Sequence, residues 1–275
     1  MRDDSRIALG LLALALLCYG TILPSYFLSD DFGFISDLGI EGRHSGEFQR
    51  FIRPIKHLSF KLDYALWGLE PFGYHLTNVL AHSAAAFALF LVARRLFQRT
   101  RLGDATLPAL LAAALFVVLP SHSESVTWIS GRSDVLATAF GLFGTCFLLG
   151  SLERGSRARA AVAALGCFAA ALLAKEAAIV LPFVWGALFV HEWWRSAERP
   201  ASASAVALIG SLAALALYFV ARKWWIGEFI GGYGAARHLA LLRTSLLAFE
   251  VEDGRAVLRR VDLPTPPPAA VEHGS

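Results

Sequence analysis

The stretch Leu119–Phe140, LPSHSESVTWISGRSDVLATAF, places a histidine, two acids, an arginine and a tryptophan between two apolar runs. An ionisable side chain at membrane depth costs about 2.5–3.5 kcal/mol on insertion scales, so such groups are usually paired or functional. The whole chain is apolar: 56% of its 275 residues are hydrophobic and 17% are charged, against about a quarter charged in soluble domains. The stretch therefore predicts a polar site at the edge of a membrane-spanning bundle.

Seven apolar segments approach the roughly 20 residues that a helix needs to cross a bilayer. They lie near residues 7–24, 75–93, 106–120, 134–152, 158–174, 177–193 and 203–221. Leucine and alanine dominate and strand-like alternation is absent, so helices are the expected spanning elements. The predicted fold class is all-α, a polytopic membrane helix bundle of about seven spans whose first apolar run is an uncleaved anchor.

Basic residues cluster in alternate loops, in the segments ARRLFQRTR, ERGSRAR and WWRSAER. The positive-inside rule places these loops and the N-terminus in the cytoplasm. The alanine- and arginine-rich composition is typical of a bacterium, so we expect a multi-pass protein of the inner membrane with its other loops in the periplasm. A net charge of +3 gives no indication of nucleic-acid binding. The unusual ionisable groups fall on the outward side, which indicates one outward-facing polar cavity.

The first outward loop begins with FLSDDFGFISD, in which Asp30 and Asp31 follow the first span. A carboxylate near aromatic rings can have a raised pKa and act as a general base towards an acceptor hydroxyl. A solvated loop start is the plain alternative. Further along, residues 45–74 mix aromatic side chains with cations. Those cations are Arg50, Arg53, Lys56 and Lys61. The pattern predicts interfacial helices whose cations either meet a lipid phosphate or simply snorkel to water.

Three polar residues share one face of the second span, since His75, Asn78 and His82 are spaced i, i+3, i+7. Such a stripe is expected to face the interior of the bundle. The two histidines are about 10 Å apart along the helix axis, too far to share one metal ion without other ligands. Interhelical hydrogen bonding is therefore preferred to metal binding.

The opening stretch would place Glu124, Trp128, Gly131 and Arg132 on one face if it is helical from Ser123. An arginine can hold a phosphate in bidentate fashion and an acid can bind sugar hydroxyls. A helix-end salt bridge with an interfacial tryptophan anchor is the alternative.

The short turn AKEA places Lys175 and Glu176 near the outer interface. A lysine there can neutralise a phosphate leaving group, and the alternative is a local ion pair worth little energy.

Taken together, SDDFGFI, the segment FIRPIKHLSFKLDYALWGLEPFGYHLTNVLAHS, the opening stretch and LLAKEAAIVLP resemble one family. They are similar to the N-terminal half of the GT-C membrane glycosyltransferase superfamily, and in particular to the transmembrane, tetratricopeptide-repeat-associated O-mannosyltransferase-like proteins. The similarity covers roughly residues 5–235. It implies a polyprenyl-phosphate-linked sugar donor and transfer to a hydroxyl of an acceptor protein or glycan on the outward face.

The resemblance also implies residue roles. The acidic pair, Asp30 and Asp31, matches the catalytic base of the family. Donor and acceptor binding is predicted for Arg53, His75, His122, Glu124, Arg132, Asp134, Lys175 and Glu176, with the phosphate held by Arg132 and Lys175. An inverting displacement needs one base and stabilisation of the departing lipid phosphate, so no metal or other cofactor is obligatory.

The C-terminal end departs from the family, because GGYGAARHLALLRTSLLAF leads into a polar, proline-rich end with neither an apolar run nor a repeat. We expect a transmembrane domain over 1–235, an interfacial helix over 236–249 and a disordered tail over 250–275. Two alternatives to an active transferase follow: a truncated, inactive remnant, or a transporter of lipid-linked sugars or small solutes.

Overall fold

The computed structural model describes residues 2–36, 51–99, 104–152, 157–195, 202–226, 246–252 and 255–261. Apart from one hairpin, these residues are helical or lie in short connections. The α-helices are α1 (Arg2–Tyr19), α2 (Asp31–Ser36), α4 (Pro54–Trp67), α5 (Pro71–Gln98), α6 (Thr106–Val118), α7 (Ser123–Thr127), α8 (Arg132–Leu152), α9 (Arg157–Ala174), α10 (Leu181–Arg195) and α11 (Ser202–Ile226). Short 3-10 turns are η1 (Gly20–Ile22), η3 (Pro120–His122), η4 (Ile129–Gly131) and η5 (Glu176–Val180).

The predicted all-α polytopic bundle is confirmed, with fewer full-length spans than the expected seven. Five helices are long and apolar enough to cross a membrane: Asp3–Ile22, Pro71–Gln98, Ile129–Leu152, Glu176–Trp194 and Ser202–Trp225. The segment after α6 bends by 53°, so Thr106–Val118 with Pro120–Thr127 makes a sixth span only if the bent pair is counted as one. The remaining apolar helix, Ala158–Ala174, is shorter than a full span. These counts refer to the described ranges alone.

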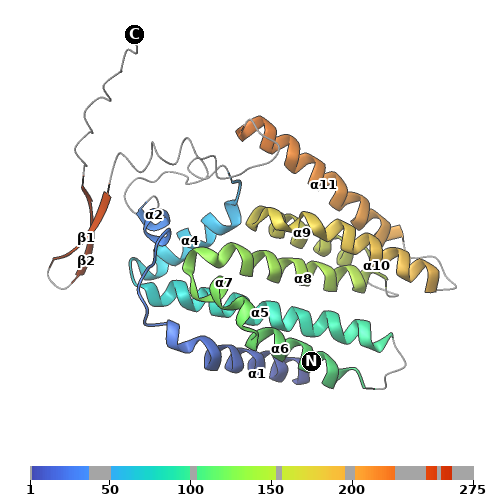
Figure 1. The fold of residues 1–275 in the computed structure, drawn as a ribbon. Coiled ribbons are helices and arrows are strands. Elements are labelled where there is room, and N and C mark those ends of the chain that lie inside the picture. The colour runs from blue at the N-terminus through green and yellow to red at the C-terminus, as the bar shows by residue number, and fades with distance from the viewer. Residues whose placement is uncertain are drawn as a thin grey trace, which may run out of the picture.

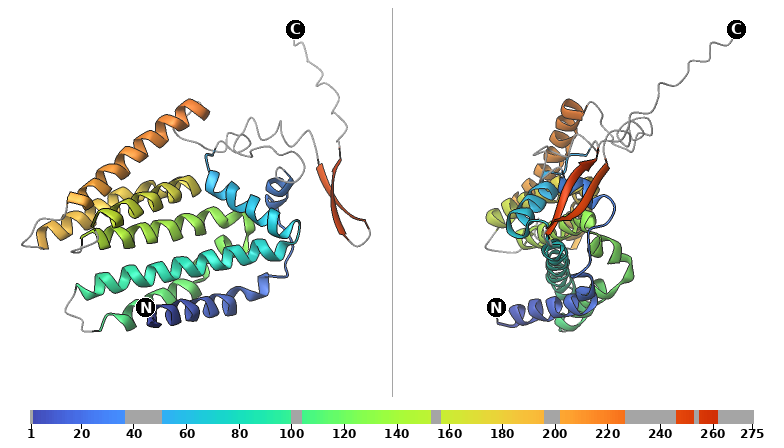
Figure 2. Two further views of the ribbon diagram at one scale, coloured as in Figure 1. Left: turned by 180° about the vertical axis from the view of Figure 1, so that it is seen from behind. Right: turned by 90° about the vertical axis from the view of Figure 1, so that its left-hand side faces the viewer.

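The helices lie side by side, with α5 and α8 in the middle of the bundle (Figures 1 and 2). Helix α5 contacts α1, α6 and α8, while α9 lies between α8 and α11. Ala85, Ala86 and Ala88 of α5 are completely buried. Small side chains at helix contacts let the backbones approach closely, and in a bilayer this close packing replaces the hydrophobic effect as the main source of association.

The two ends of the bundle differ in chemistry. At one end, Arg94 pairs with Asp4 and Arg99 pairs with Glu192, so the basic cluster at the end of α5 is held against α1 and α10. At the other end α5 and α8 begin, α6 and α9 end, and helices α2 and α4 lie beside them (Figure 1). We call this second end the site end, because every predicted site residue lies there.

The structure differs from the expectation for the C-terminal region. Residues 236–245 lie outside the described residues, but Leu246–Glu252 (β1) and Arg255–Val261 (β2) form an antiparallel hairpin that pairs Leu246 with Val261 and Glu252 with Arg255. The interfacial helix therefore does not extend over 246–249, and part of the predicted tail is a strand. The overlooked signal was the Asp253-Gly254 pair, a strong hairpin dipeptide, between segments rich in valine, leucine and phenylalanine.

Candidate functional site

The acidic pair is split by the backbone of its own loop. Ser29 adopts a left-handed conformation with φ of 50°, which non-glycine residues seldom do. After this turn Asp31 is 1% exposed, whereas Asp30 remains exposed. Two adjacent carboxylates of the same sequence motif thus occupy opposite environments.

Asp31 serves as an anchor between two loops. Its Oδ1 accepts hydrogen bonds from the backbone N–H of Ser130 at 2.8 Å and from Ser130 Oγ at 2.5 Å. Its Oδ2 accepts from the N–H of Leu28 at 3.0 Å. Both carboxylate oxygens of Asp31 are therefore engaged. They satisfy buried backbone N–H groups, and leaving such a donor without an acceptor would be costly in free energy. Asp30, by contrast, has one long hydrogen bond, from Ser29 Oγ at 3.4 Å.

Arg132 is fully buried at the centre of the site end. Its Nη1 forms an ion pair with Asp63 Oδ2 at 2.5 Å, its Nε donates to Asn78 Oδ1 at 2.7 Å and its Nη2 donates to the carbonyl of Tyr74 at 2.7 Å. The guanidinium also stacks 4.5 Å from the ring centre of Phe60. These contacts engage all three nitrogens of the fork, and the side chain is 0% exposed. In this structure the Arg132 guanidinium is engaged by protein groups, and its expected role in holding the donor phosphate stays a prediction.

A break in the second loop directs Arg132 inwards. Helix α7 stops at Thr127, Trp128 is extended (φ −81°, ψ 120°) and η4 leads directly into α8. A Cβ at Gly131 would lie 3.0 Å from the backbone of Ser125, so a larger residue would have to push the two segments apart by a few tenths of an ångström. The expected continuous helix is therefore wrong, and Glu124 does not share a face with Arg132. Glu124 is instead exposed on α7.

The polar face of α5 points into the bundle, as predicted. His75, Asn78 and His82 are all buried. The amide of Asn78 donates to the carbonyls of Val126 at 3.2 Å and Trp128 at 3.1 Å, in addition to accepting from Arg132. The expected interhelical hydrogen bonding is thus confirmed for Asn78. His75 lies next to the acidic loop, near the backbone of Ser25 and Tyr26.

The loop that contains Lys175 and Glu176 is joined by ion pairs to the start of α4 and to the start of α8. Arg53, at the start of α4, donates to Glu176 through Nε at 3.1 Å and Nη2 at 2.6 Å. Lys175, which precedes η5, pairs with Asp134 on the first turn of α8 at 2.5 Å. Four residues predicted to bind donor or acceptor therefore contact one another, and the three loops form one connected polar surface.

The Lys175–Asp134 pair is partly solvated, with side chains 26% and 42% exposed. Exposed pairs of this kind typically contribute about 0.2–1 kcal/mol. We expect a double-mutant cycle of Lys175→Met and Asp134→Asn to give a coupling energy in that range, measured from unfolding in detergent. The coupling should shrink at about 1 M salt, where the Debye length is about 3 Å. A coupling well above about 2 kcal/mol that is insensitive to salt would contradict this assignment.

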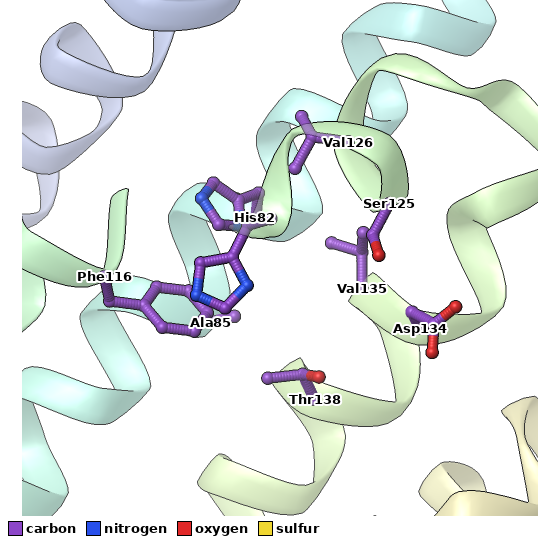
Figure 3. Close-up of a pocket in the computed structure, with 9 residues that line it drawn as sticks. His82, Ala85, Phe116, Ser125, Val126, Asp134, Val135 and Thr138 are labelled. Atoms are coloured by element: carbon purple, nitrogen blue, oxygen red, sulfur yellow. The ribbon is translucent and has the colours of Figure 1, made fainter. Parts of the chain in front are cut away.

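A small cavity opens beside this network, between α5, α7 and α8 (Figure 3). It has about 260 Å³ of empty space and is partly open to solvent. Its lining consists of His82, Ala85, Phe116, His122, Ser125, Val126, Asp134, Val135 and Thr138. His82 stacks on Phe116 with ring centres 4.9 Å apart, and His122 lies 4.4 Å from the same ring. Nε2 of His82 is buried and makes no hydrogen bond within the described part of the chain. Aromatic rings beside hydroxyl, imidazole and carboxylate groups suit a small polyhydroxylated ligand.

Helix α4 has an unusual distribution of side chains. Its buried face carries Lys56 and Asp63, whereas three leucines spaced by four residues are exposed on the other face. These are Leu58 (63%), Leu62 (59%) and Leu66 (66%). An apolar stripe that the protein does not cover is expected to lie against lipid, as in interfacial helices. Helix α4 thus supports the predicted interfacial position, and its buried charged groups, Lys56 and Asp63, lie on the covered face.

Lys56 is 3% exposed and does not snorkel to water. Its Nζ lies 3.8 Å from the ring centre of Phe34 and 5.6 Å from that of Phe60. Burial, together with the nearby positive charge of Arg53, lowers the pKa of Lys56 to about 7, although the carboxylates of Asp31 and Asp30 act in the opposite direction. The sequence could not separate Lys56 from the exposed Lys61, because hydropathy does not show which face of an interfacial helix is covered.

Sequence reasoning also missed the partners of Arg132 and Asp31. Asp63 accepts from Thr77 Oγ1 at 2.8 Å besides pairing with Arg132, and Ser130 is the partner of Asp31. Within the ranges that the structure describes, no group of three or more histidine, cysteine, aspartate or glutamate residues is arranged to hold a metal ion.

Comparison with known proteins finds relatives that are named as protein O-mannosyl-transferases. The chain is 39% identical over 143 residues to Protein O-mannosyl-transferase Tmtc1 of Drosophila melanogaster, which is 49% of this chain and 15% of that protein. It is 37% identical over 142 residues to Protein O-mannosyl-transferase TMTC2 of Mus musculus, covering 50% of this chain and 16% of the relative. Mouse Protein O-mannosyl-transferase TMTC3 is 37% identical over 103 residues, or 38% of this chain and 10% of the relative.

These matches cover only a small part of each relative, between 10% and 16% of its length. No protein-family model matches the chain, and no solved structure matches it significantly. The resemblance inferred from the motifs is nevertheless confirmed by these relatives. About half of the chain is therefore homologous to the transmembrane, tetratricopeptide-repeat-associated protein O-mannosyl-transferases.

Proposed function

We propose that the chain is the site-bearing part of a membrane glycosyltransferase. It moves a sugar, with mannose as the first candidate, from a polyprenyl-phosphate donor to a hydroxyl of a protein or glycan on the periplasmic side. The proposal is supported by the names of the relatives and by the concentration of polar groups at one end of an apolar bundle. The basic clusters at the opposite end support the proposed orientation, with the N-terminus in the cytoplasm.

The proposed reaction is one displacement at the anomeric carbon. The acceptor oxygen forms a bond to C1 of the sugar while the bond from C1 to the phosphate oxygen breaks. The hydroxyl proton passes to a carboxylate, and the polyprenyl phosphate leaves with the electron pair of the broken bond. The protein must therefore supply a base near the acceptor and positive charge near the phosphate.

Asp30 is the base in this proposal. The observation that carries the assignment is the division of the acidic pair, in which Asp31 has both oxygens engaged and Asp30 is exposed. The oxygens of Asp31 are directed at Leu28 and Ser130 in a buried position and so are not presented to an acceptor hydroxyl. Asp31 instead fixes the loop against Ser130 and so holds Asp30 at the surface of the site.

The sugar ring is assigned to the cavity beside α8. His122 and Phe116 offer ring faces. Asp134, Ser125 and Thr138 offer hydrogen-bonding groups across the cavity from Phe116 (Figure 3). The space of about 260 Å³ includes the part that is open to solvent. It leaves no room for an oligosaccharide, and one sugar ring would lie partly in the open mouth.

Thr138→Leu is expected to fill this cavity. Thr138 is an exposed residue of α8 that faces the cavity in Figure 3, so the larger side chain should leave the bundle stable. Loss of a hydroxyl together with added bulk should raise the KM for the donor by about 10–200-fold, the range that small changes in a pocket produce. Thr138→Ser, which keeps the hydroxyl, is the matched control. An unchanged KM in Thr138→Leu would show that the donor does not bind in this cavity.

Sealed membrane vesicles, with the site end facing either inwards or outwards, test both the transfer activity and the side of the membrane on which it takes place. The vesicles carry the full chain and polyprenyl-phosphate mannose, and a membrane-impermeant acceptor is added outside. Transfer is expected only where the site end faces the acceptor. Transfer only in the opposite orientation would reverse the proposed topology, and transfer in neither would contradict the function.

A further inference from the structure

We infer that Lys56 forms the anion subsite of the proposed transferase and takes the phosphodiester of the lipid-linked sugar donor. The inference rests on the proposed function, because that function supplies a lipid-borne phosphate. It replaces the phosphate role that the sequence suggested for Arg132, whose guanidinium is already engaged by protein groups.

Lys56 is a buried cation of the site end for which the described residues provide no counter-ion. Arg53 pairs with Glu176, Arg132 with Asp63 and Lys175 with Asp134. No ion pair or hydrogen bond from Lys56 Nζ is formed with the described parts of the chain, and its neighbours are the rings of Phe34 and Phe60. A buried charge is stable only when it is paired, so the charged form of Lys56 is favoured by an anion that these parts of the chain do not provide.

The neighbouring carboxylates do not fill this role. Asp31 accepts three hydrogen bonds from Leu28 and Ser130, and Asp30 points to the exposed side of its loop. The titratable and charged groups around Lys56 are Asp30 and Asp31 at the start of α2, Arg53 and His57 on its own helix, and Arg132 on α8. Arg53 and Arg132 are already balanced by Glu176 and Asp63, so Lys56 supplies the positive charge with which an incoming phosphate can pair.

The position of α4 favours an anion carried by a lipid. Lys56 lies on the covered face of the helix, while Leu58, Leu62 and Leu66 are exposed on the other face. A helix with leucines towards the bilayer and a lysine towards the site can meet the acyl chain and the head group of one molecule. The phosphate of such a molecule would lie near Asp30, where the proposed displacement takes place.

Binding of this anion is coupled to uptake of a proton. The pKa of Lys56 is about 7 in the free protein, and a phosphate beside the ammonium raises it, because an opposite charge favours the charged form. Affinity is therefore highest below the free-state pKa and falls as the pH rises above it. When one proton is involved, the affinity falls by at most about tenfold per pH unit. A sugar phosphodiester does not itself titrate near neutral pH, so the pH dependence of the affinity reports the titration of a protein group.

Chemical labelling of the wild-type chain tests the inference without any substitution. The full chain in phosphatidylcholine vesicles is reductively methylated, and the modification of each lysine is read by peptide mass spectrometry. Polyprenyl-phosphate mannose is expected to protect Lys56 and to leave the exposed Lys61 of the same helix unchanged. Phosphatidylglycerol at the same concentration should not protect Lys56. Equal protection by both lipids would assign the site to ordinary head groups, and absence of protection by either would overturn the inference.

A second measurement uses donor affinity as a function of pH. In the wild type the affinity should fall by at least about tenfold between about pH 7 and 9, whereas Lys56→Arg should bind with nearly constant affinity, because guanidinium remains charged. Lys56→Met should bind weakly at every pH. Any contribution of His57 is common to all three proteins. A slope in Lys56→Arg equal to that of the wild type would overturn the inference.

These readouts separate the inference from the function on which it rests. Protection of Lys56 without any sugar transfer would leave the anion site in place and contradict the transferase. Transfer without protection of Lys56 would leave the transferase in place and contradict the anion site.

Discussion

Arg132→Met is expected to lower the stability of the folded chain by about 3–5 kcal/mol, the usual cost of removing one partner from a buried ion pair. The substitution leaves Asp63 buried without its counter-ion and deprives Asn78 and the Tyr74 carbonyl of their donor. Because folded domains are stable by only about 5–15 kcal/mol, much of the variant should be misfolded. The fraction that is monodisperse in detergent and its apparent melting temperature measure the effect.

A paired substitution separates charge from packing in this network. Arg132→Met/Asp63→Asn removes both charges, and the amide oxygen that replaces the carboxylate can still accept from Thr77. Part of the lost stability should return, since replacing both members of a buried pair is far less costly than removing one. Arg132→Lys should recover little, because a single ammonium cannot reach Asp63, Asn78 and Tyr74 in the way that the guanidinium fork does. A fully stable Arg132→Met would contradict the central position assigned to this residue.

Asp30→Asn is expected to abolish most of the transfer activity while the chain remains folded. A positioned general base contributes about 10²–10⁴-fold to the rate, and an amide cannot accept the proton. The side chain is exposed and has one long hydrogen bond, from Ser29, so the melting temperature should stay close to that of the wild type. Transfer rates per folded molecule, with melting temperature measured in parallel, check both parts.

Asp31→Asn is the matched comparison at the neighbouring position. Its amide group would face the N–H of Leu28, so one of three hydrogen bonds is lost and a buried donor is left unpaired. This should cost about 1–3 kcal/mol of stability. Activity per folded molecule should fall less than in Asp30→Asn. The opposite pattern, with a stable but inactive Asp31→Asn and an active Asp30→Asn, would exchange the two roles.

The sequence predicted those parts of the fold that depend on periodicity and composition. The apolar runs indicated the positions of the helices, and the spacing of His75, Asn78 and His82 indicated the buried face of α5, because a helical period determines which residues share a side. The motifs also placed the polar groups at one end of the bundle. The resemblance drawn from them is confirmed by the relatives.

The partners of the charged residues were not predictable, since they depend on contacts between loops far apart in the chain. Arg132 reaches Asp63, and Arg53 reaches Glu176 across 123 positions. The sequence treated these residues as ligands for a substrate because no local pattern shows that two loops meet. The break after α7 and the close approach of η4 to that helix likewise arise from packing. Lys56 was indistinguishable from its exposed neighbours for the same reason.

The most direct test of the account is sugar transfer by the purified full chain in reconstituted vesicles. Labelled mannose on polyprenyl phosphate is the donor, a hydroxyl-bearing acceptor is present, and wild type and Asp30→Asn are compared at equal amounts of folded protein. We expect acceptor labelling by the wild type and a rate lower by about 10²–10⁴-fold in Asp30→Asn. Equal labelling by the two proteins, or none by a folded wild type supplied with several sugar donors, would contradict it.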